Sequence, residues 1–370
     1  MTTLDRAEVS TPAVPETRRS SSPRPAVLAG ALVALRAIGG GLLVVLCAVT
    51  ITFIVTRVLA PDPTHLFLGS AGFANAEAEA EARERIQEQL GLDKPIPVQY
   101  VTYLGDIAQG DLGTSFQTGR PVVSDLLDRL PATAELAVLA LLIGVSLGVI
   151  GGILAARRPR GWVDRIVSLL TLGGLAIPQF WIGIMLIWIF TVKLQLLPPP
   201  VGRLPVGVVP PPHVTGFYLP DALISGNPAL AGQVLAQLVL PTITLAVGLA
   251  APIAKVVRTS MSEALTSDYV RTARALGFGG RRITFVYALK NGLLPVVTIL
   301  AGIVAFTFVG SILVEGVFGW PGVGAYSLQA IRTSDFPVVQ GFVLYASALY
   351  VVVYEVLAVT YRLIDPRARA

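Results

Sequence analysis

The residue types that usually carry catalysis are scarce in this sequence and stand in none of the familiar spacings. None of the four lysines follows a glycine, which excludes the Gly-x-x-x-x-Gly-Lys-Ser/Thr loop that holds nucleotide phosphates. Two histidines and the single cysteine, Cys47, supply neither a metal-ligand cluster nor a nucleophile–base pair. We therefore expect no catalytic residue, no metal site and no cofactor in this chain, and an energy supply from a partner or a gradient.

Two apolar stretches are interrupted, one by a carboxylate and the other by a proline. Glu355 stands midway along the last stretch, and a carboxylate inside a membrane indicates function by default. It either faces a pathway, where it could attract the amino end of a peptide, or bonds to neighbouring helices. Pro178, with Gln179 beside it, frees a backbone carbonyl that must find a partner. The resulting kink either faces a pathway or serves helix packing alone.

A polar, basic stretch at residues 267–295 lies between two long apolar segments. Asp268 to Leu276 predicts a short helix, with Ser267 as its N-cap, Asp268 at the positive end of the helix dipole and Gly277 as its stop. A helix of about nine residues is marginal alone in water, so a tertiary or partner surface should hold it.

The faces of this short helix differ in chemistry. Tyr269, Ala273 and Leu276 share one face at helical spacing, whereas Arg271 and Arg274 project elsewhere. The pattern predicts a small knob with an apolar tip, suited to a socket on another protein.

Composition places the chain in the membrane. Of its 370 residues 54% are hydrophobic and 14% charged, with a mean hydropathy of +0.70. Soluble domains carry about 25% charged residues. The net charge of +5 does not indicate nucleic-acid binding, because the basic residues flank apolar segments as topology signals.

Six apolar stretches predict six transmembrane helices and an all-α polytopic fold. The predicted spans are 37–60, 133–156, 166–191, 235–257, 293–314 and 338–361. The predicted segments between them are a disordered tail at 1–36, an extracytoplasmic domain at 61–132, a cytoplasmic loop at 157–165, a Pro-rich external loop at 192–234, a basic cytoplasmic loop at 258–292, an external segment at 315–337 and a cytoplasmic C-terminus at 362–370. Most of the 28 lysines and arginines fall on the side of both termini and the basic loop, which predicts that this side is cytoplasmic.

Several motifs resemble one family of transporters. DYVRTARALG and ALKNGLLP are similar to the coupling loop of ABC importer permeases in the dipeptide/oligopeptide/nickel branch. Arg271-Thr272-Ala273 stands where the general motif has Glu-Ala-Ala, and Gly277 stands at the glycine of that motif. Because the Glu is absent here, a docking role cannot rest on a salt bridge made by that Glu. Asp111-Leu112-Gly113, Gly119-Arg120-Pro121-Val122, Phe318-Gly319-Trp320-Pro321-Gly322 and Asp335-Phe336-Pro337 resemble external segments of the same branch.

The resemblance implies the type I ABC importer permease fold in a bacterial cell membrane. It implies import of di- or oligopeptides with a second homologous permease, two ATPases that bind ATP and Mg²⁺, and an extracytoplasmic solute-binding lipoprotein. The residues implied to contact an ATPase are Asp268, Tyr269, Arg271, Thr272, Ala273, Arg274, Ala275, Leu276 and Gly277.

Three alternatives stay open. The same branch includes permeases for nickel and glutathione, although the spans contain no cluster of metal ligands. A proton-coupled carrier is a different class, for which the isolated Glu355 is weak support. A scaffold or channel without a transport cycle is the third alternative.

Overall fold

The computed structural model of the protein describes residues 26–59, 81, 84 and 94–364. The chain divides into two compact units, residues 1–42 and 43–370. In the first unit the described residues form the start of helix α1 (Ala26–Ile54), so residues 26–36 are helical and not part of a disordered tail. Their run of Ala, Leu and Val explains the helix, because these residues are apolar and Ala and Leu favour it. The predicted tail before residue 26, nearly all of 61–93, and 365–370 lie outside the described residues.

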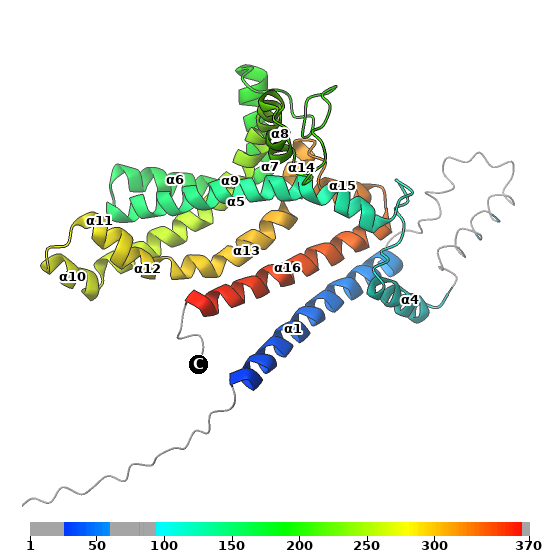
Figure 1. The fold of residues 1–370 in the computed structure, drawn as a ribbon, viewed down its shortest axis with the longest axis horizontal. Helices are drawn as coiled ribbons and strands as arrows, with labels where there is room; N and C mark the ends of the chain where they lie inside the picture. The colour runs from blue at the N-terminus through cyan, green and yellow to red at the C-terminus, as the bar shows by residue number, and fades with distance from the viewer. Residues whose placement is uncertain (1–25, 60–80, 82–83, 85–93, 365–370) are drawn as a thin grey trace, which may run out of the picture. The chain divides into compact units, whose positions relative to one another are not determined.

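In the described part of the second unit the regular elements are helices, joined by loops, with one isolated bridge between Thr114 and Pro121. Figure 1 shows its elements. Those that position the candidate site are α4 (Ile96–Ala108), α5 (Val122–Arg157), α6 (Trp162–Ala176), α7 (Gln179–Leu186), η2 (Ile187–Lys193), α8 (Tyr218–Ile224), α9 (Pro228–Thr266), α10 (Asp268–Ala275), α11 (Gly280–Arg282), η3 (Ile283–Ala288), α12 (Leu289–Gly292), α13 (Leu294–Gly310), α14 (Ile312–Val317), α15 (Val323–Arg332) and α16 (Phe336–Ile364).

Helices α5 and α9 are the centre of the unit and lie side by side (Figure 1). Three glycines one turn apart on α5 allow the close approach, because a Cβ on any of them would overlap α9. A Cβ at Gly148 would lie 2.7 Å from the Cβ of Ile253, and one at Gly152 would lie 2.6 Å from that of Val257. Small residues at such a seam let helix backbones pack closely in membranes.

The same contacts give the direction of the chain. Gly144, Gly148 and Gly152 meet successively later residues of α9, so α5 and α9 run parallel. The chain between them must therefore return, and it does so through α6, α7 and η2, which bend by 107° at residues 177–178. Among the described residues five helices are long and apolar enough to span a membrane, and the bent pair makes a sixth if it counts as one span.

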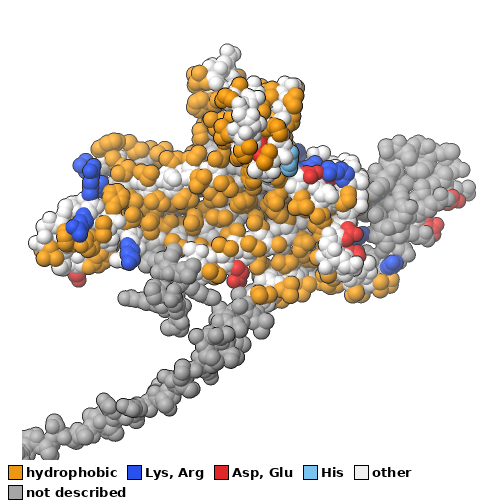
Figure 2. All heavy atoms as spheres, viewed as in Figure 1, with side chains coloured by type: hydrophobic (Ala, Val, Ile, Leu, Met, Phe, Trp, Pro, Cys, Tyr) orange, Lys and Arg blue, Asp and Glu red, His pale blue; other side chains and the backbone are white. Residues whose placement is uncertain are grey.

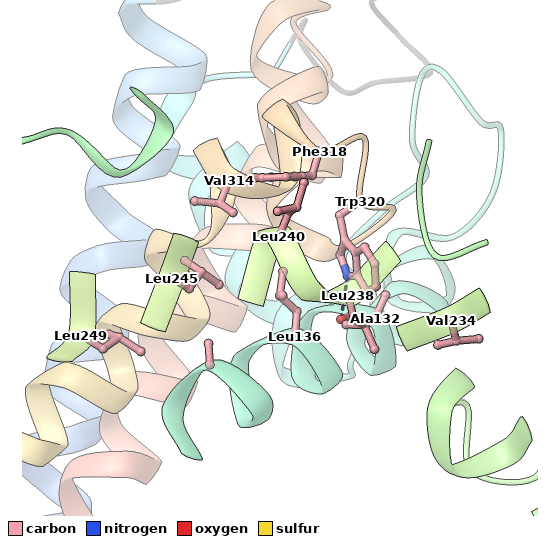
Figure 3. Close-up of a cluster of buried hydrophobic side chains, with 11 residues drawn as sticks. Ala132, Leu136, Val234, Leu238, Leu240, Leu245, Leu249, Val314, Phe318 and Trp320 are labelled. Atoms are coloured by element: carbon pink, nitrogen blue, oxygen red, sulfur yellow. Dashed lines mark hydrogen bonds between the residues drawn. The ribbon is translucent and has the colours of Figure 1, made fainter. Parts of the chain in front are cut away.

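A buried apolar cluster joins α5, α9 and α14 at the end where α5 begins (Figure 3). Leu136, Leu238 and Phe318 are among its members, and Trp320 donates a hydrogen bond from Nε1 to the backbone oxygen of Ala132, 2.8 Å away. A second buried cluster lies at the other end of α9, where Met261 packs with residues of α10 and η3.

The predicted span boundaries mark the apolar stretches and differ from the helix ends. Helix α5 begins at Val122, inside the segment predicted as extracytoplasmic, and α9 extends from Pro228 to Thr266. The Pro-rich segment contains α8, and 315–337 contains α15. Hydropathy reports the part of a helix that fits the hydrocarbon layer, whereas caps and breaks such as Pro121 decide where the helix ends.

Candidate coupling site and translocation path

Helix α10 follows α9 in the chain after a single non-helical residue. Helix α9 ends at Thr266 and α10 begins at Asp268, so Ser267 alone separates them. Ser267 is the N-cap residue of α10, as predicted, but its hydroxyl donates to the backbone oxygen of Ala264 at 2.6 Å and makes no cap bond to α10. Ser267 is thus the last cap of α9 and the first of α10, and its hydroxyl bonds to the last turn of α9. Asp268 lies within 3.6 Å of Arg271 on the exposed surface.

The far end of α10 matches its prediction. Gly277 has a φ of 79°, and its amide donates to Arg274, while the amide of Phe278 donates to Ala273. This pair of bonds is the Schellman arrangement, in which glycine adopts the left-handed conformation without steric cost. The ring of Phe278 then stacks on Tyr287 with centroids 5.5 Å apart, which holds the following turn.

The apolar face of α10 is divided between two surfaces. Val270 and Ala273 are buried against the second cluster, together with Met261 of α9 and Ile283 of η3. Leu276, by contrast, is 70% exposed, and Tyr269 is also exposed. Burial thus anchors α10 to its own chain through Val270, which the sequence reading did not single out.

Of the nine residues implied to contact an ATPase, all except Ala273 are exposed. They lie on one short helix and its glycine stop, next to the exposed Arg281 and Arg282 of α11. Figure 2 shows lysine and arginine side chains gathered at this end of the molecule. An apolar tip within a basic rim is a surface suited to a partner protein.

The interruption at Pro178 is a full break in the helix and more than a kink. Ile177 is extended, because a residue before proline is pushed out of the helical region. Helix α6 ends at Ala176, and α7 starts at Gln179 in a direction 107° away. Pro178 has no amide to donate to the carbonyl four residues earlier. Its own carbonyl accepts from the amides of Trp181 and Ile182, which begins the first turn of α7.

Gln179 packs directly on α9. A Cβ at Gly248 would lie 1.8 Å from the side-chain Nε2 of Gln179, so this side chain in its present position lies against the backbone of Gly248. Helix α7 therefore contacts the central helix directly after the break. Pro178 itself is exposed and Gln179 half-buried, on a face with no neighbour among the described residues that covers it fully.

Glu355 lies elsewhere. It is half-buried on α16, a helix that packs mainly against α13 and α15. Within the described residues it makes no hydrogen bond or ion pair, and its helix has no extensive contact with α7, which carries Gln179. The three residues predicted for the translocation path thus lie at two separate sites. Pro178 and Gln179 are at the break between α6 and α7, and Glu355 is on α16.

The buried charges whose partners the sequence does not predict include a pair that anchors the Pro-rich segment. Arg203 donates from Nη2 to Glu135 of α5 at 2.6 Å and to the backbone oxygen of Gly216 at 2.9 Å. Its guanidinium lies 3.5 Å from the ring centre of Tyr218. Nearby, the Asp221 carboxylate accepts bonds from the hydroxyl and amide of Thr215 and from the amide of Gly216. The segment is thus a folded structure fixed to α5, and not a simple spacer.

A second missed carboxylate is Glu315 of α14, which is fully buried. It accepts from the hydroxyls of Thr133 and Ser311, at 2.8 and 2.9 Å, and from the amide of Ala325 at 2.8 Å. It fits only because Gly322 has no side chain, since a Cβ there would lie 2.4 Å from the carboxylate. The glycines that follow Glu315 were the available sequence signal for this site.

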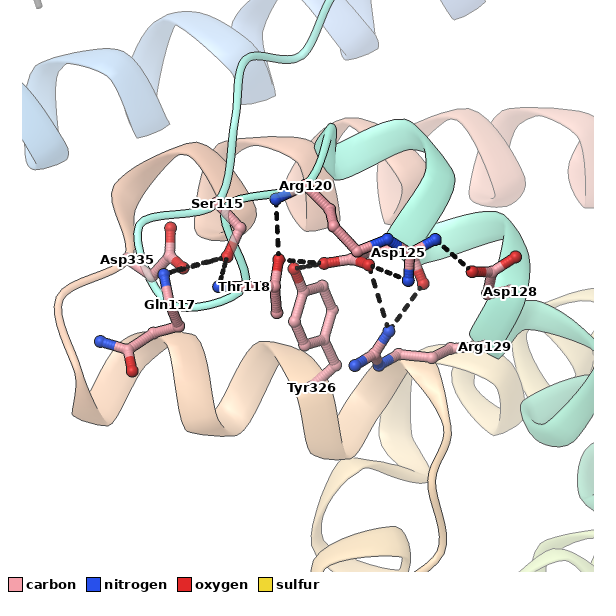
Figure 4. A network of polar contacts seen from close by, with 9 residues as sticks. All are labelled: Ser115, Gln117, Thr118, Arg120, Asp125, Asp128, Arg129, Tyr326 and Asp335. Atoms are coloured by element: carbon pink, nitrogen blue, oxygen red, sulfur yellow. Dashed lines mark hydrogen bonds and ion pairs between the residues drawn. The ribbon is translucent and has the colours of Figure 1, made fainter.

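A polar network joins residues 115–129 to α15 and the start of α16 (Figure 4). Asp125 accepts from the hydroxyls of Tyr326 and Thr118, at 2.7 and 2.6 Å, and pairs with Arg120 at 3.0 Å. Asp335 accepts from the hydroxyl of Ser115 at 2.6 Å. Burial and the bond to Asp125 raise the pKa of Tyr326 to about 12, so it stays a donor across the physiological pH range.

Three of the motifs that resembled external permease segments therefore meet in space. Asp111-Leu112-Gly113 and Gly119-Arg120-Pro121-Val122 precede α5, and Asp335-Phe336-Pro337 begins α16. Ser115, between the first two motifs, bonds to Asp335, and a Cβ on Gly113 would lie 3.6 Å from that of Pro337. The hydrogen-bonded residues are far apart in sequence, 220 positions for Ser115 and Asp335, so local spacing cannot predict these bonds.

Comparison with known proteins agrees with this architecture. The family model described as "Binding-protein-dependent transport system inner membrane component" matches residues 148–370, and a model of the N-terminal part of such components matches residues 32–137. The chain is 42% identical over 328 residues to the probable D,D-dipeptide transport system permease protein DdpB of Escherichia coli K12, covering 89% of this chain and 94% of that protein.

Two further relatives are similar over comparable lengths. The di/tripeptide transport system permease protein DppB of Pseudomonas aeruginosa is 38% identical, with 86% of this chain and 93% of that protein covered. The dipeptide permease DppB of Alkalihalophilus pseudofirmus is 36% identical, with 89% and 96% covered. With its all-α polytopic fold, this chain belongs to the family of binding-protein-dependent transport system inner membrane components, the permeases of ABC transporters.

Proposed function

We propose that this chain is a permease subunit of an ATP-driven importer of di- or oligopeptides. The observation that carries the proposal is near full-length similarity to permeases named for dipeptides, together with an exposed helix α10 on a chain without a nucleotide-binding loop. The subunit would form the path with a second permease and receive peptide from an extracytoplasmic binding protein. Two ATPases holding ATP and Mg²⁺ would supply the energy.

The proposed mechanism is rigid-body switching driven from α10. Closure of the ATPases on ATP would displace α10, whose buried Val270 and Ala273 fix it to the cluster around the end of α9. Gln179 of the interrupted span packs on Gly248 of α9, so motion of α9 would reach that span. Both termini and α10 would be cytoplasmic, in keeping with the positive charge of that side.

Transport into proteoliposomes tests this function. The complete transporter, with both permeases, the ATPases and the binding protein, is reconstituted, and uptake of a labelled dipeptide is measured with and without ATP. We expect accumulation against a gradient that requires ATP and survives a protonophore. Uptake that needs no ATP and stops with a protonophore would instead establish a proton-coupled carrier. Accumulation of Ni²⁺ or glutathione without dipeptide would refute the substrate assignment alone.

The same uptake assay can test the role of α10 with a substitution at its exposed end and a matched control. Leu276→Asp should remove ATP-dependent uptake, because it places a charge on the apolar tip, while insertion stays normal because Leu276 is 70% exposed. Val206→Asp is the control, since Val206 is 89% exposed in the Pro-rich segment, away from α10. Unchanged uptake with Leu276→Asp would refute the role of α10.

A further inference from the structure

Asp164, near the start of α6, connects three elements at the end of the molecule that carries α10. Its Oδ2 accepts from the amide of Arg160 at 2.8 Å, and its two oxygens accept from Nε and Nη2 of Arg258 on α9, the latter at 3.0 Å. A two-pronged arginine–carboxylate pair fixes orientation as well as distance. Arg160 has a φ of 62°, uncommon for a residue with a side chain, so the turn before α6 is held in an unusual conformation beside this pair.

On the α9 side, Arg258 is firmly connected to α10. Helix α9 continues from Arg258 to Thr266, and only Ser267 separates it from α10. Met261, three residues after Arg258, is fully buried in the cluster that also contains Val270 of α10. A displacement of α10 therefore carries Arg258 with it.

On the other side, Asp164 belongs to the helix that leads to the break. Helix α6 (Trp162–Ala176) carries Asp164 in its first turn, and a Cβ at Gly174 would lie 2.9 Å from that of Ala251, so α6 packs closely on α9. The break at Ile177 follows directly. At the other end of α6 the connection to α9 is the ion pair, in which 5% of the Asp164 side chain and 42% of the Arg258 side chain are exposed.

We propose that the Asp164–Arg258 pair makes α6, and with it the break at 177–178, follow the motion of α10. Both are positioning residues, since they hold two helices in register and contact no substrate. The inference rests on the proposed function, because ATPases must impose the motion at α10. A pair that only stabilised the fold would affect uptake and ATP hydrolysis in the same proportion.

The experiment compares Asp164→Ala, Arg258→Ala and the double variant in the reconstituted transporter. Arg165→Ala and Lys255→Ala are matched controls, because each removes an exposed charge close to one member of the pair. Dipeptide uptake per ATP hydrolysed and thermal stability are measured for each. Arg258→Ala leaves a buried carboxylate unpaired and should lower stability, whereas the double variant removes that carboxylate and should recover it.

We expect uptake per ATP to fall roughly 2- to 30-fold in both single variants and to stay low in the double variant, even where stability recovers. The controls should match the wild type. Recovery of the ratio together with stability, or an unchanged ratio in all three variants, would overturn the proposal while leaving the proposed function intact. Failure of the wild-type transporter to couple uptake to ATP would refute the proposed function, and the linkage with it.

Discussion

The seam between α5 and α9 gives a quantitative prediction from a single added methyl group. In Gly148→Ala the new Cβ would lie 2.7 Å from two atoms of Ile253 and 2.9 Å from the backbone oxygen of Ala250. These distances are too short for any carbon contact, and a backbone oxygen cannot rotate away. The helices must separate, and overpacking of this kind costs about 1–3 kcal/mol.

The matched variant is Gly151→Ala on the same helix. A Cβ at Gly151 would have Val167 as its nearest neighbour at 3.9 Å, an ordinary contact. Both substitutions gain the same helix propensity, about 0.5–1 kcal/mol over glycine. That gain cancels in the comparison, so the difference in unfolding free energy between the two variants isolates the overpacking.

Unfolding in detergent micelles by added SDS, followed by circular dichroism, measures this difference. Gly148→Ala should be less stable than Gly151→Ala by about 1–3 kcal/mol. The packing argument is refuted if the two variants differ by less than about 0.5 kcal/mol, within the usual range of neutral substitutions. The same result would remove the reason for placing α5 and α9 in direct backbone contact.

Three other predictions concern the polar anchors. Arg203→Ala should destabilise the protein by about 3–5 kcal/mol, because it leaves Glu135 buried without its partner, and adding Glu135→Gln should restore part of the loss in a melting experiment. Burial opposes ionisation of Asp221, but its hydrogen bonds prevail and lower its pKa. Its stabilising contribution is therefore complete above the unfolded pKa of about 3.9 and lost as the pH falls through the lower folded value. Hydrogen exchange of the Pro-rich segment should accelerate over that acidic range in the wild type and lose this dependence in Asp221→Asn. Tyr326→Phe should cost about 1.5–3 kcal/mol, because it removes a donor to the charged Asp125; an unchanged melting temperature would contradict this.

Local chemistry was sufficient to predict α10 and its end. The helix and the glycine at 277 follow from short-range rules, and both appear in the structure. The role of Ser267 did not follow, because the same residue ends α9, and the length of α9 depends on packing along its whole course. The interruption at Pro178 follows from the sequence, but neither its angle of 107° nor the packing of Gln179 on Gly248 can be predicted from local spacing.

Long-range charge pairing lay beyond sequence reasoning. Glu135 and Arg203 are 68 positions apart, and Asp164 and Arg258 are 94 apart. Their meeting depends on the parallel course of α5 and α9 and the return of the chain through α6. Glu355 stands alone in an apolar stretch, whereas the carboxylates with several hydrogen bonds, such as Glu135 and Glu315, accept them from residues distant in sequence.

The central claim is that α10 receives force from an ATPase, and chemical cross-linking tests it most directly. The single native cysteine, Cys47, is replaced by Ser, and Leu276→Cys or Val206→Cys is introduced into the assembled transporter. A thiol-to-amine cross-linker should join the chain to an ATPase subunit from position 276 and not from position 206. An ATPase adduct from position 206 with none from 276, or labelling of position 276 by a membrane-impermeant thiol reagent outside intact cells, would contradict the account.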